Sequence, residues 1–193
     1  MKKFLLIIFA LIAVMTLTAC NKKDSDIPDG MQYFEKNGED NEGEIGENEA
    51  IDYRVYFPEG WICDRNDLVV SAHVSDEDRS NVSVMAYTPS GDDYQYIQEN
   101  SFEKWINESF KKSLENSFLD YSLVEGLKEA KLGEKDARSL VYTVSVDSQT
   151  YKIKQLITNY KGNIYVLTYT SPEESYGANL EALDMIIKHF EFK

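Results

Sequence analysis

The chain of 193 residues carries 34 acidic and 20 basic residues, a formal charge of −14, so a strongly basic face for nucleic acid is not expected. Hydrophobic residues make up 42% and charged residues 28%, which is typical of a globular protein and not of a disordered or fibrous one. Two cysteines and two histidines exclude a disulfide scaffold and a Cys- or His-rich zinc site.

The first twenty residues have the pattern of an export signal. Lys2 and Lys3 precede an unbroken apolar run at residues 4–15, which is shorter than the ~20 residues that a membrane-spanning helix needs. The sequence LTAC at residues 17–20 resembles the bacterial lipobox. This resemblance implies cleavage before Cys20, diacylglycerol on its thiol, and acylation of the new amine with a palmitate-type chain. The alternatives are an ordinary secretory signal with a chance cysteine, or an uncleaved anchor.

Lipid would have to hold this protein at the membrane by itself. Removal of residues 1–19 takes away two lysines and no acids, which leaves 18 basic and 34 acidic residues and a net charge of −16. Anionic headgroups repel such a body, whereas each buried methylene of an acyl chain contributes about 0.8 kcal/mol. We therefore predict a lipid-anchored protein on the extracytoplasmic face of the cell membrane.

Residues 20–50 are predicted to form an acidic, disordered tether. Residues 21–50 contain ten acidic and three basic residues and only six hydrophobic ones, too little apolar surface to offset the entropy lost on ordering. The segment is either a spacer that lifts the domain off the membrane or a solvated leader segment with no further function. An EF-hand-like spacing of Asp24, Asp26 and Glu35 lacks the required glycine and flanking helices, so it does not predict a calcium site.

Residues 51–193 read as one α+β domain. Alternating or β-branched segments predict six strands, and short turns between the last three predict antiparallel pairing. The segments are residues 51–57, 67–75, 81–88, 139–146, 151–160 and 164–170. Apolar residues at intervals of three and four predict a helix at residues 100–118, with Asn100 and Glu103 as its cap pair. A closing helix is predicted after Ser171 as N-cap, with Pro172 in its first turn.

Three segments of this domain resemble the PsbP-like family. They are the strand and turn at residues 53–61 (YRVYFPEGW), the strand and helix start at residues 163–176 (NIYVLTYTSPEESY), and the ending at residues 187–192 (IKHFEF). The resemblance implies an α/β/α sandwich around an antiparallel sheet of about six strands. This fold is shared by the plant extrinsic photosystem II protein and the Ran-binding Mog-type proteins. The resemblance also implies a non-catalytic, partner-binding function.

No residue set in the sequence predicts an enzyme, a cofactor or a resident metal. Cys63 is the one thiol besides Cys20, and a nucleophile would need His73 or His189 beside it. The two S-x-x-K sequences on the predicted helix lack their companion motifs, and no phosphate-binding glycine loop or H-E-x-x-H motif occurs. The acidic clusters at residues 76–78 and 92–93 are read as solvated turns, with weak calcium binding as the alternative.

A tyrosine-rich loop is the predicted partner contact. Tyr87, Tyr94 and Tyr96 surround a Pro-Ser-Gly turn in residues 86–96, and aromatic side chains on a loop suit a recognition surface. The alternative is that they pack over the edge of the sheet. The function predicted from the sequence is a surface-exposed lipoprotein that acts as a non-catalytic binding or scaffold module for an unknown envelope protein. The alternative is a small-ligand or metal-binding lipoprotein accessory to a transporter.

Overall fold

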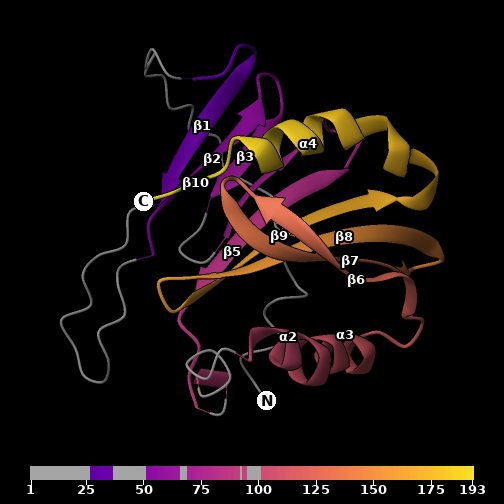
Figure 1. The fold of residues 1–193 in the computed structure, drawn as a ribbon. Coiled ribbons are helices and arrows are strands. Elements are labelled where there is room, and N and C mark those ends of the chain that lie inside the picture. Colours follow the sequence, from indigo (N-terminus) through magenta and orange to yellow (C-terminus); the bar gives the residue numbers. More distant parts are fainter. Residues whose placement is uncertain (1–26, 37–50, 66–68, 92, 95–100) are drawn as a thin grey trace.

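The computed structural model describes residues 27–36, 51–65, 69–91, 93–94 and 101–193. Two antiparallel sheets form the framework, a seven-stranded sheet in the order β3-β4-β5-β9-β8-β7-β6 and a three-stranded sheet in the order β1-β2-β10 (Figure 1). The strands of the larger sheet are β3 (Ile62–Arg65), β4 (Val69–His73), β5 (Asn81–Tyr87), β6 (Ser122–Leu132), β7 (Lys135–Val146), β8 (Gln149–Tyr160) and β9 (Asn163–Pro172). Those of the smaller sheet are β1 (Met31–Lys36), β2 (Tyr53–Pro58) and β10 (Glu191–Phe192).

The larger sheet is covered on both faces, and the helices lie on opposite sides of it. Successive side chains of a strand point to opposite faces, so Tyr165, Leu167 and Tyr169 of β9 join one hydrophobic cluster with the small sheet and the last helix. Ile164 and Val166 join a second cluster, with the first helical segment. The predicted α+β class is confirmed. Periodicity does not tell whether the two helical segments share a face of the sheet, and the structure places them on opposite faces.

The first helical segment is interrupted by a π-helical turn. It consists of α2 (Phe102–Trp105), the π-helix η3 (Ile106–Phe110) and α3 (Lys111–Ser117). Its buried side chains are those of the apolar stripe that predicted it, including Trp105, Phe110 and Leu114. The expected cap pair stays a prediction, because Asn100 lies outside the described residues. The Glu103 carboxylate accepts a hydrogen bond from Nε of Arg138 at 2.5 Å.

The predicted tether boundary at residue 50 is wrong for residues 31–36. These residues form β1, which pairs antiparallel with β2 from Met31 opposite Pro58 to Lys36 opposite Tyr53. The ring of Phe34 lies 5.9 Å from that of Phe57, centroid to centroid. Composition predicts disorder for this stretch because it has few apolar residues, but pairing with β2 supplies partners for its backbone groups. The folded domain therefore begins before residue 51.

Strand β6 is an edge strand that the sequence pattern did not predict. Its pairing with β7 shifts register between Leu123 and Glu125 and again between Glu125 and Lys128, and most of its side chains are exposed. Such irregularities break the period of two on which a strand prediction depends. Bulges and charges at an edge also hinder pairing with other chains.

The closing helix begins later than predicted. Strand β9 continues through Pro172, a 3₁₀ helix η4 spans Glu173–Asn179, and α4 spans Leu180–Lys188. Ser171, expected to cap the helix, is buried and its hydroxyl accepts a hydrogen bond from the Ser80 hydroxyl at 2.8 Å. A contact across 91 residues of sequence thus uses the side chain that a local pattern assigned to capping.

Candidate functional site

The predicted recognition loop follows strand β5, and the structure describes part of it. Tyr87 is the last residue of β5, and its ring packs against the cluster beneath the first helical segment. Tyr94 is half-buried, and its backbone N–H donates to the carbonyl of Gly91 at 3.1 Å. Gly91 has a φ of +66°, a conformation that glycine adopts without strain. Tyr96 lies outside the described residues.

A partly buried hydrogen bond joins this loop to the helical layer. The indole N–H of Trp105 donates to Oδ1 of Asp93 at 2.7 Å. Trp105 is fully buried and packs on the rings of Phe102 and Phe110, with centroid distances of 5.9 and 5.6 Å. Asp93 therefore positions the loop against α2. Sequence reasoning assigned Trp105 to the core and Asp93 to an acidic pair, and no spacing in the sequence signals that the two meet.

We call the group of Tyr87, Asp93, Tyr94, Trp105 and Asn159 the β5 corner. Tyr87 lies opposite Ile164 of β9, and Ile164 lies opposite Asn159 of β8, so the side chains of these three residues stand in one row across three strands. Burial, and after it the negative charge of Asp93, raises the pKa of Tyr87, so its hydroxyl stays protonated at neutral pH. The corner thus combines a neutral phenol, a carboxylate and an indole, and the Asn159 amide stands two strands from Tyr87 in the same row.

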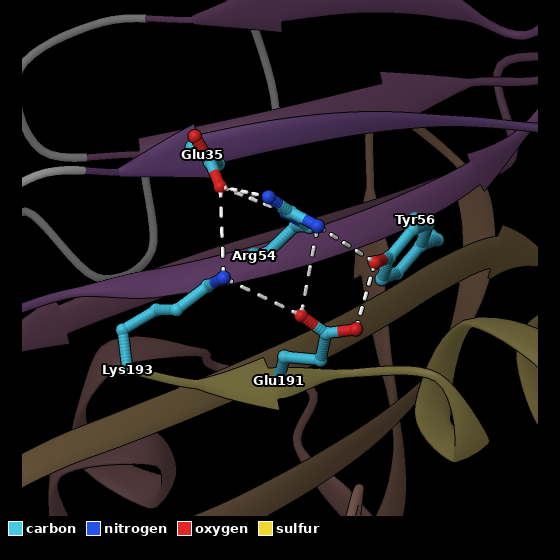
Figure 2. A network of polar contacts seen from close by, with 5 residues as sticks. All are labelled: Glu35, Arg54, Tyr56, Glu191 and Lys193. Carbon is cyan, nitrogen blue, oxygen red and sulfur yellow. Dashed lines mark hydrogen bonds and ion pairs between the residues drawn. The ribbon is translucent and has the colours of Figure 1, made fainter. Parts of the chain in front are cut away.

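A second polar cluster ties the two ends of the domain to strand β2 (Figure 2). The Arg54 guanidinium of β2 bonds the carboxylate of Glu35 on β1, with Nε at 2.8 Å, and lies 3.9 Å from a carboxylate oxygen of Glu191 on β10. The Tyr56 hydroxyl donates to Glu191 at 2.7 Å, and Lys193 Nζ lies 3.7 Å from both carboxylates. Figure 2 shows Arg54 between the two glutamates.

The charges of this cluster have a structural role. The hydrogen bond from Arg54 is the largest cause that lowers the pKa of Glu35. Hydrogen bonds from its guanidinium to Tyr56 and then to Glu35 raise the pKa of Arg54, against the opposing effect of burial. Both groups therefore stay ionised near neutral pH, which suits holding strands together and not proton transfer.

Cys63 and His73 do not form a catalytic pair. Cys63 of β3 lies opposite Ala72 of β4, so its side chain shares a face with Ala72 and lies on the opposite face from His73. Burial, with a smaller effect of the Asp64 charge, raises the pKa of Cys63 to about 12, so the thiol is protonated at neutral pH. Its sulfur donates to the Trp61 carbonyl at 3.7 Å.

The acidic turn at residues 76–78 is built by hydrogen bonds. The carboxylate of Asp78 accepts from the backbone N–H of Ser80 at 2.9 Å and from Nδ2 of Asn179 at 3.2 Å. Burial alone would raise the pKa of Asp78, but these hydrogen bonds outweigh it and lower the pKa. In the described ranges, no three His, Cys, Asp or Glu side chains are grouped so as to hold a metal ion.

The predicted lipid-attachment residue, Cys20, lies outside the described residues. Among the helices that the structure does describe, none is both long and apolar enough to cross a membrane. The attachment at Cys20 and the partner contacts of the three tyrosines therefore stay predictions.

No protein-family model matches the sequence, and no curated protein matches it by sequence. Solved structures match in fold. LpqN of Mycobacterium tuberculosis, described as involved in cell envelope biogenesis, has a TM-score of 0.51 at 12% identity, over 84% of this chain and 91% of LpqN. A structure from Bacteroides thetaiotaomicron VPI-5482 has a TM-score of 0.52 at 12% identity, over 73% of this chain, which spans only 45% of that protein.

A PsbP structure is also among the structural neighbours. CyanoP, the cyanobacterial PsbP of Synechocystis sp. PCC 6803, matches 90% of this chain over 98% of its own length, at 15% identity and a TM-score of 0.48. At 12–15% identity these matches show the fold alone. The chain shares an α+β fold with LpqN.

Proposed function

We propose that this chain is a lipid-anchored, extracytoplasmic domain that binds a protein partner at the bacterial cell membrane and catalyses no reaction. The observation that carries the proposal is the sequence LTAC at residues 17–20 after the apolar run of residues 4–15. It places a lipidation site seven residues before Ile27, the first described residue of the domain. At about 3.5 Å per residue, seven residues reach at most about 25 Å, so the domain stays close to the membrane.

Strand β1 separates Cys20 from the most acidic stretch of the chain. β1 begins at Met31, opposite Pro58, which is the end of the strand nearer in sequence to Cys20. It ends at Lys36, opposite Tyr53, where residues 37–50 follow with six acidic residues and no basic one. Strand β1 therefore stands in the sequence between Cys20 and the most acidic stretch of the chain.

The partner-binding role rests on the loop after β5. Tyr87 and Tyr94 are half-buried and lie beside the hydrogen bond between Asp93 and Trp105, which positions the loop on the helical layer. An anchored domain needs no pocket to hold a protein partner, and rigidly held aromatic side chains make effective contacts. The involvement of LpqN in cell envelope biogenesis is compatible with this location, although 12% identity supports only a shared fold.

We expect Cys20→Ser to abolish both lipidation and membrane attachment, because the thiol is the acceptor of the diacylglycerol. Cells fed an alkyne analogue of palmitate should label the wild-type protein and not the variant, and only the wild type should sediment with membranes. Cys63→Ser is the matched control and should keep both properties. Mass spectrometry that finds Cys20 unmodified, or residues 1–19 still attached, would contradict the proposal.

The double substitution of Tyr94 and Tyr96 by alanine should weaken partner capture while the melting temperature stays unchanged. Tyr94 belongs to neither of the two hydrophobic clusters, and Tyr96 lies outside the described residues. Capture is measured by pull-down from crosslinked envelopes. Leu123→Ala with Val124→Ala, two exposed residues of β6, is the control and should capture normally. Equal capture by all three proteins would remove the loop from the binding surface.

A further inference from the structure

One face of the seven-stranded sheet carries a group of lysines near its β6 edge. On this face, Leu156 of β8 and Tyr169 of β9 belong to the hydrophobic cluster that α4 covers. Because side chains of a strand alternate between faces, Lys152 and Lys154 of β8 lie on the same face as Leu156. Both lysines are only half-buried. A ligand can therefore reach them from solvent.

Cross-strand pairing brings two charged residues of β6 to the same place. Lys154 lies opposite Val141 of β7, and Val141 lies opposite Glu125 of β6, so these three residues stand in one row. Nζ of Lys128 donates to Oε2 of Glu125 at 2.8 Å. That hydrogen bond and the Lys128 charge lower the pKa of Glu125, with smaller effects of the Lys154 and Lys152 charges. We call Glu125, Lys128, Lys152 and Lys154 the lysine group.

Lys152 and Lys154 carry positive charges that no carboxylate of the described ranges pairs. Neither forms an ion pair there, not even with Glu173 or Glu174, which follow β9 in η4. Nζ of Lys152 lies 4.8 Å from the ring centroid of Tyr176, a cation–π contact that positions the ammonium. The three lysines and one glutamate give the lysine group a net charge of +2, in a chain whose net charge is −14. The group thus attracts anions locally, although the chain as a whole repels them.

Hydroxyl groups lie between and beside the lysines. Thr143 of β7 lies opposite Lys152 of β8 and opposite Ser122 of β6. Ser139 of β7 lies opposite Lys128 of β6. Thr143 and Ser139 are half-buried and Ser122 is exposed, so all three hydroxyls are accessible from the same side as the lysines. Hydroxyl and ammonium groups both donate hydrogen bonds to an anionic oxygen, so this face offers charge together with hydrogen bonds.

The spacing of the two unpaired lysines favours a particular kind of anion. Residues two apart in a strand stand about 6.6–7 Å from each other on one face. An extended peptide with acidic residues at alternate positions presents its carboxylates at the same interval. Such a peptide can therefore pair with Lys152 and Lys154 at once, with one carboxylate for each ammonium.

We propose that the lysine group binds an extended segment of the partner protein that carries acidic residues at alternate positions. The inference rests on the proposed function in one respect, that the occupant is a protein. It uses a surface other than the loop after β5, because the lysine group lies on the face of α4 and the loop is joined to the helical layer on the other face. Lys152 and Lys154 pair with the acidic residues of the partner, while Lys128 neutralises Glu125 beside them.

The test uses the purified full chain in a non-ionic detergent and two fluorescein-labelled eight-residue peptides of four glutamates and four serines. One peptide alternates the two residues, and the other has its glutamates in adjacent pairs separated by pairs of serine. Only the alternating peptide presents carboxylates two residues apart on one face. Fluorescence anisotropy at low ionic strength should therefore show that it binds and that the paired peptide binds several-fold more weakly. Added salt should weaken the binding.

Two double variants locate the binding site. Lys152→Gln with Lys154→Gln should raise the Kd of the alternating peptide at least about fivefold, since two ion pairs are lost. Lys111→Gln with Lys112→Gln makes the same change in net charge on α3, across the sheet, and should leave the Kd within about twofold. Lys154→Gln alone breaks no ion pair with a described residue, so it should melt as the wild type does and still bind the peptide more weakly.

Four results would overturn the inference. They are that the alternating peptide fails to bind, that both peptides bind equally, that the two double variants weaken binding equally, and that inorganic polyphosphate binds the same lysines more tightly than the alternating peptide does. In the last case the occupant is a phosphate polymer and not a protein segment.

This inference and the proposed function fail in different experiments. If the peptide results hold while Cys20→Ser stays at the membrane, the proposed anchoring is wrong and the lysine group remains a binding site for acidic segments. If Cys20→Ser and the double tyrosine variant behave as expected while the peptide binds independently of Lys152 and Lys154, only this inference is wrong.

Discussion

Replacing Trp105 with alanine should destabilise the domain by about 3–5 kcal/mol, the usual cost of removing a large aromatic side chain from a core. The side chain is fully buried, and it packs against Phe102 and Phe110. Its loss also leaves the carboxylate of Asp93 without the indole N–H. Since native domains are stable by only about 5–15 kcal/mol, the midpoint of urea unfolding should fall sharply.

Two further variants serve as controls for Trp105→Ala. Trp105→Phe keeps most of the apolar contact and loses the N–H donor, so its midpoint should lie between those of the wild type and Trp105→Ala. Leu119→Ala removes a fully exposed side chain in the connection between α3 and β6, and its effect should stay within about 0.5 kcal/mol. If Trp105→Ala shifts the midpoint no more than Leu119→Ala does, the helical layer is not held by this residue.

Gly133→Ala should lower the melting temperature by roughly 10 °C or more, from a loss of about 3–5 kcal/mol. Gly133 joins β6 to β7 with a φ of +52°, which costs an L-residue about 1–2 kcal/mol. A Cβ atom there would lie 2.0 Å from the Phe190 carbonyl oxygen, a contact that backbone must move to relieve. That movement would break the hydrogen bond from Gly133 N–H to the Ile187 carbonyl, now 2.8 Å.

Gly177→Ala is the matched control for this substitution. Gly177 lies in η4, has no positive φ, and has no atom of a neighbouring residue within 4 Å of the place that a Cβ atom would take. Its replacement should change stability by at most about 0.5 kcal/mol. If the melting temperature of Gly133→Ala equals that of the wild type, the turn between β6 and β7 does not pack against the end of α4.

Part of the β5 corner could be anticipated from the sequence. The loop with Tyr87 and Tyr94 is marked by its aromatic content next to a Pro-Ser-Gly turn, and both residues lie in the β5 corner. The hydrogen bond from Trp105 to Asp93 and the position of Asn159 in the same row as Tyr87 could not be anticipated. They depend on the pairing of β9 with both β5 and β8 and on the packing of α2 on the sheet, and no periodic pattern relates residues on separate elements.

Three of the local predictions failed for particular physical causes. Strand β1 lies in a stretch whose acidic composition predicts disorder, and it is ordered by pairing with β2. Strand β6 has register shifts that remove the alternation of apolar residues. Ser171 has the residue type of an N-cap, yet the Ser80 hydroxyl across the sheet binds it. In each case a contact with a distant segment outweighs the local preference.

The sequence by itself determined the export pattern with its lipobox-like end, the acidic charge, the six predicted strands and the two helical segments. Each of these features depends on composition or on residues that lie close together in the chain. A period of two or of three to four states which face of an element is apolar. Only the tertiary structure decided that the helices cover opposite faces, that β1 and β10 flank β2, that Trp105 bonds Asp93, and that Asn159 stands in one row with Tyr87. Such choices depend on which apolar faces and backbone edges meet, and residues far apart in the chain set those energies together.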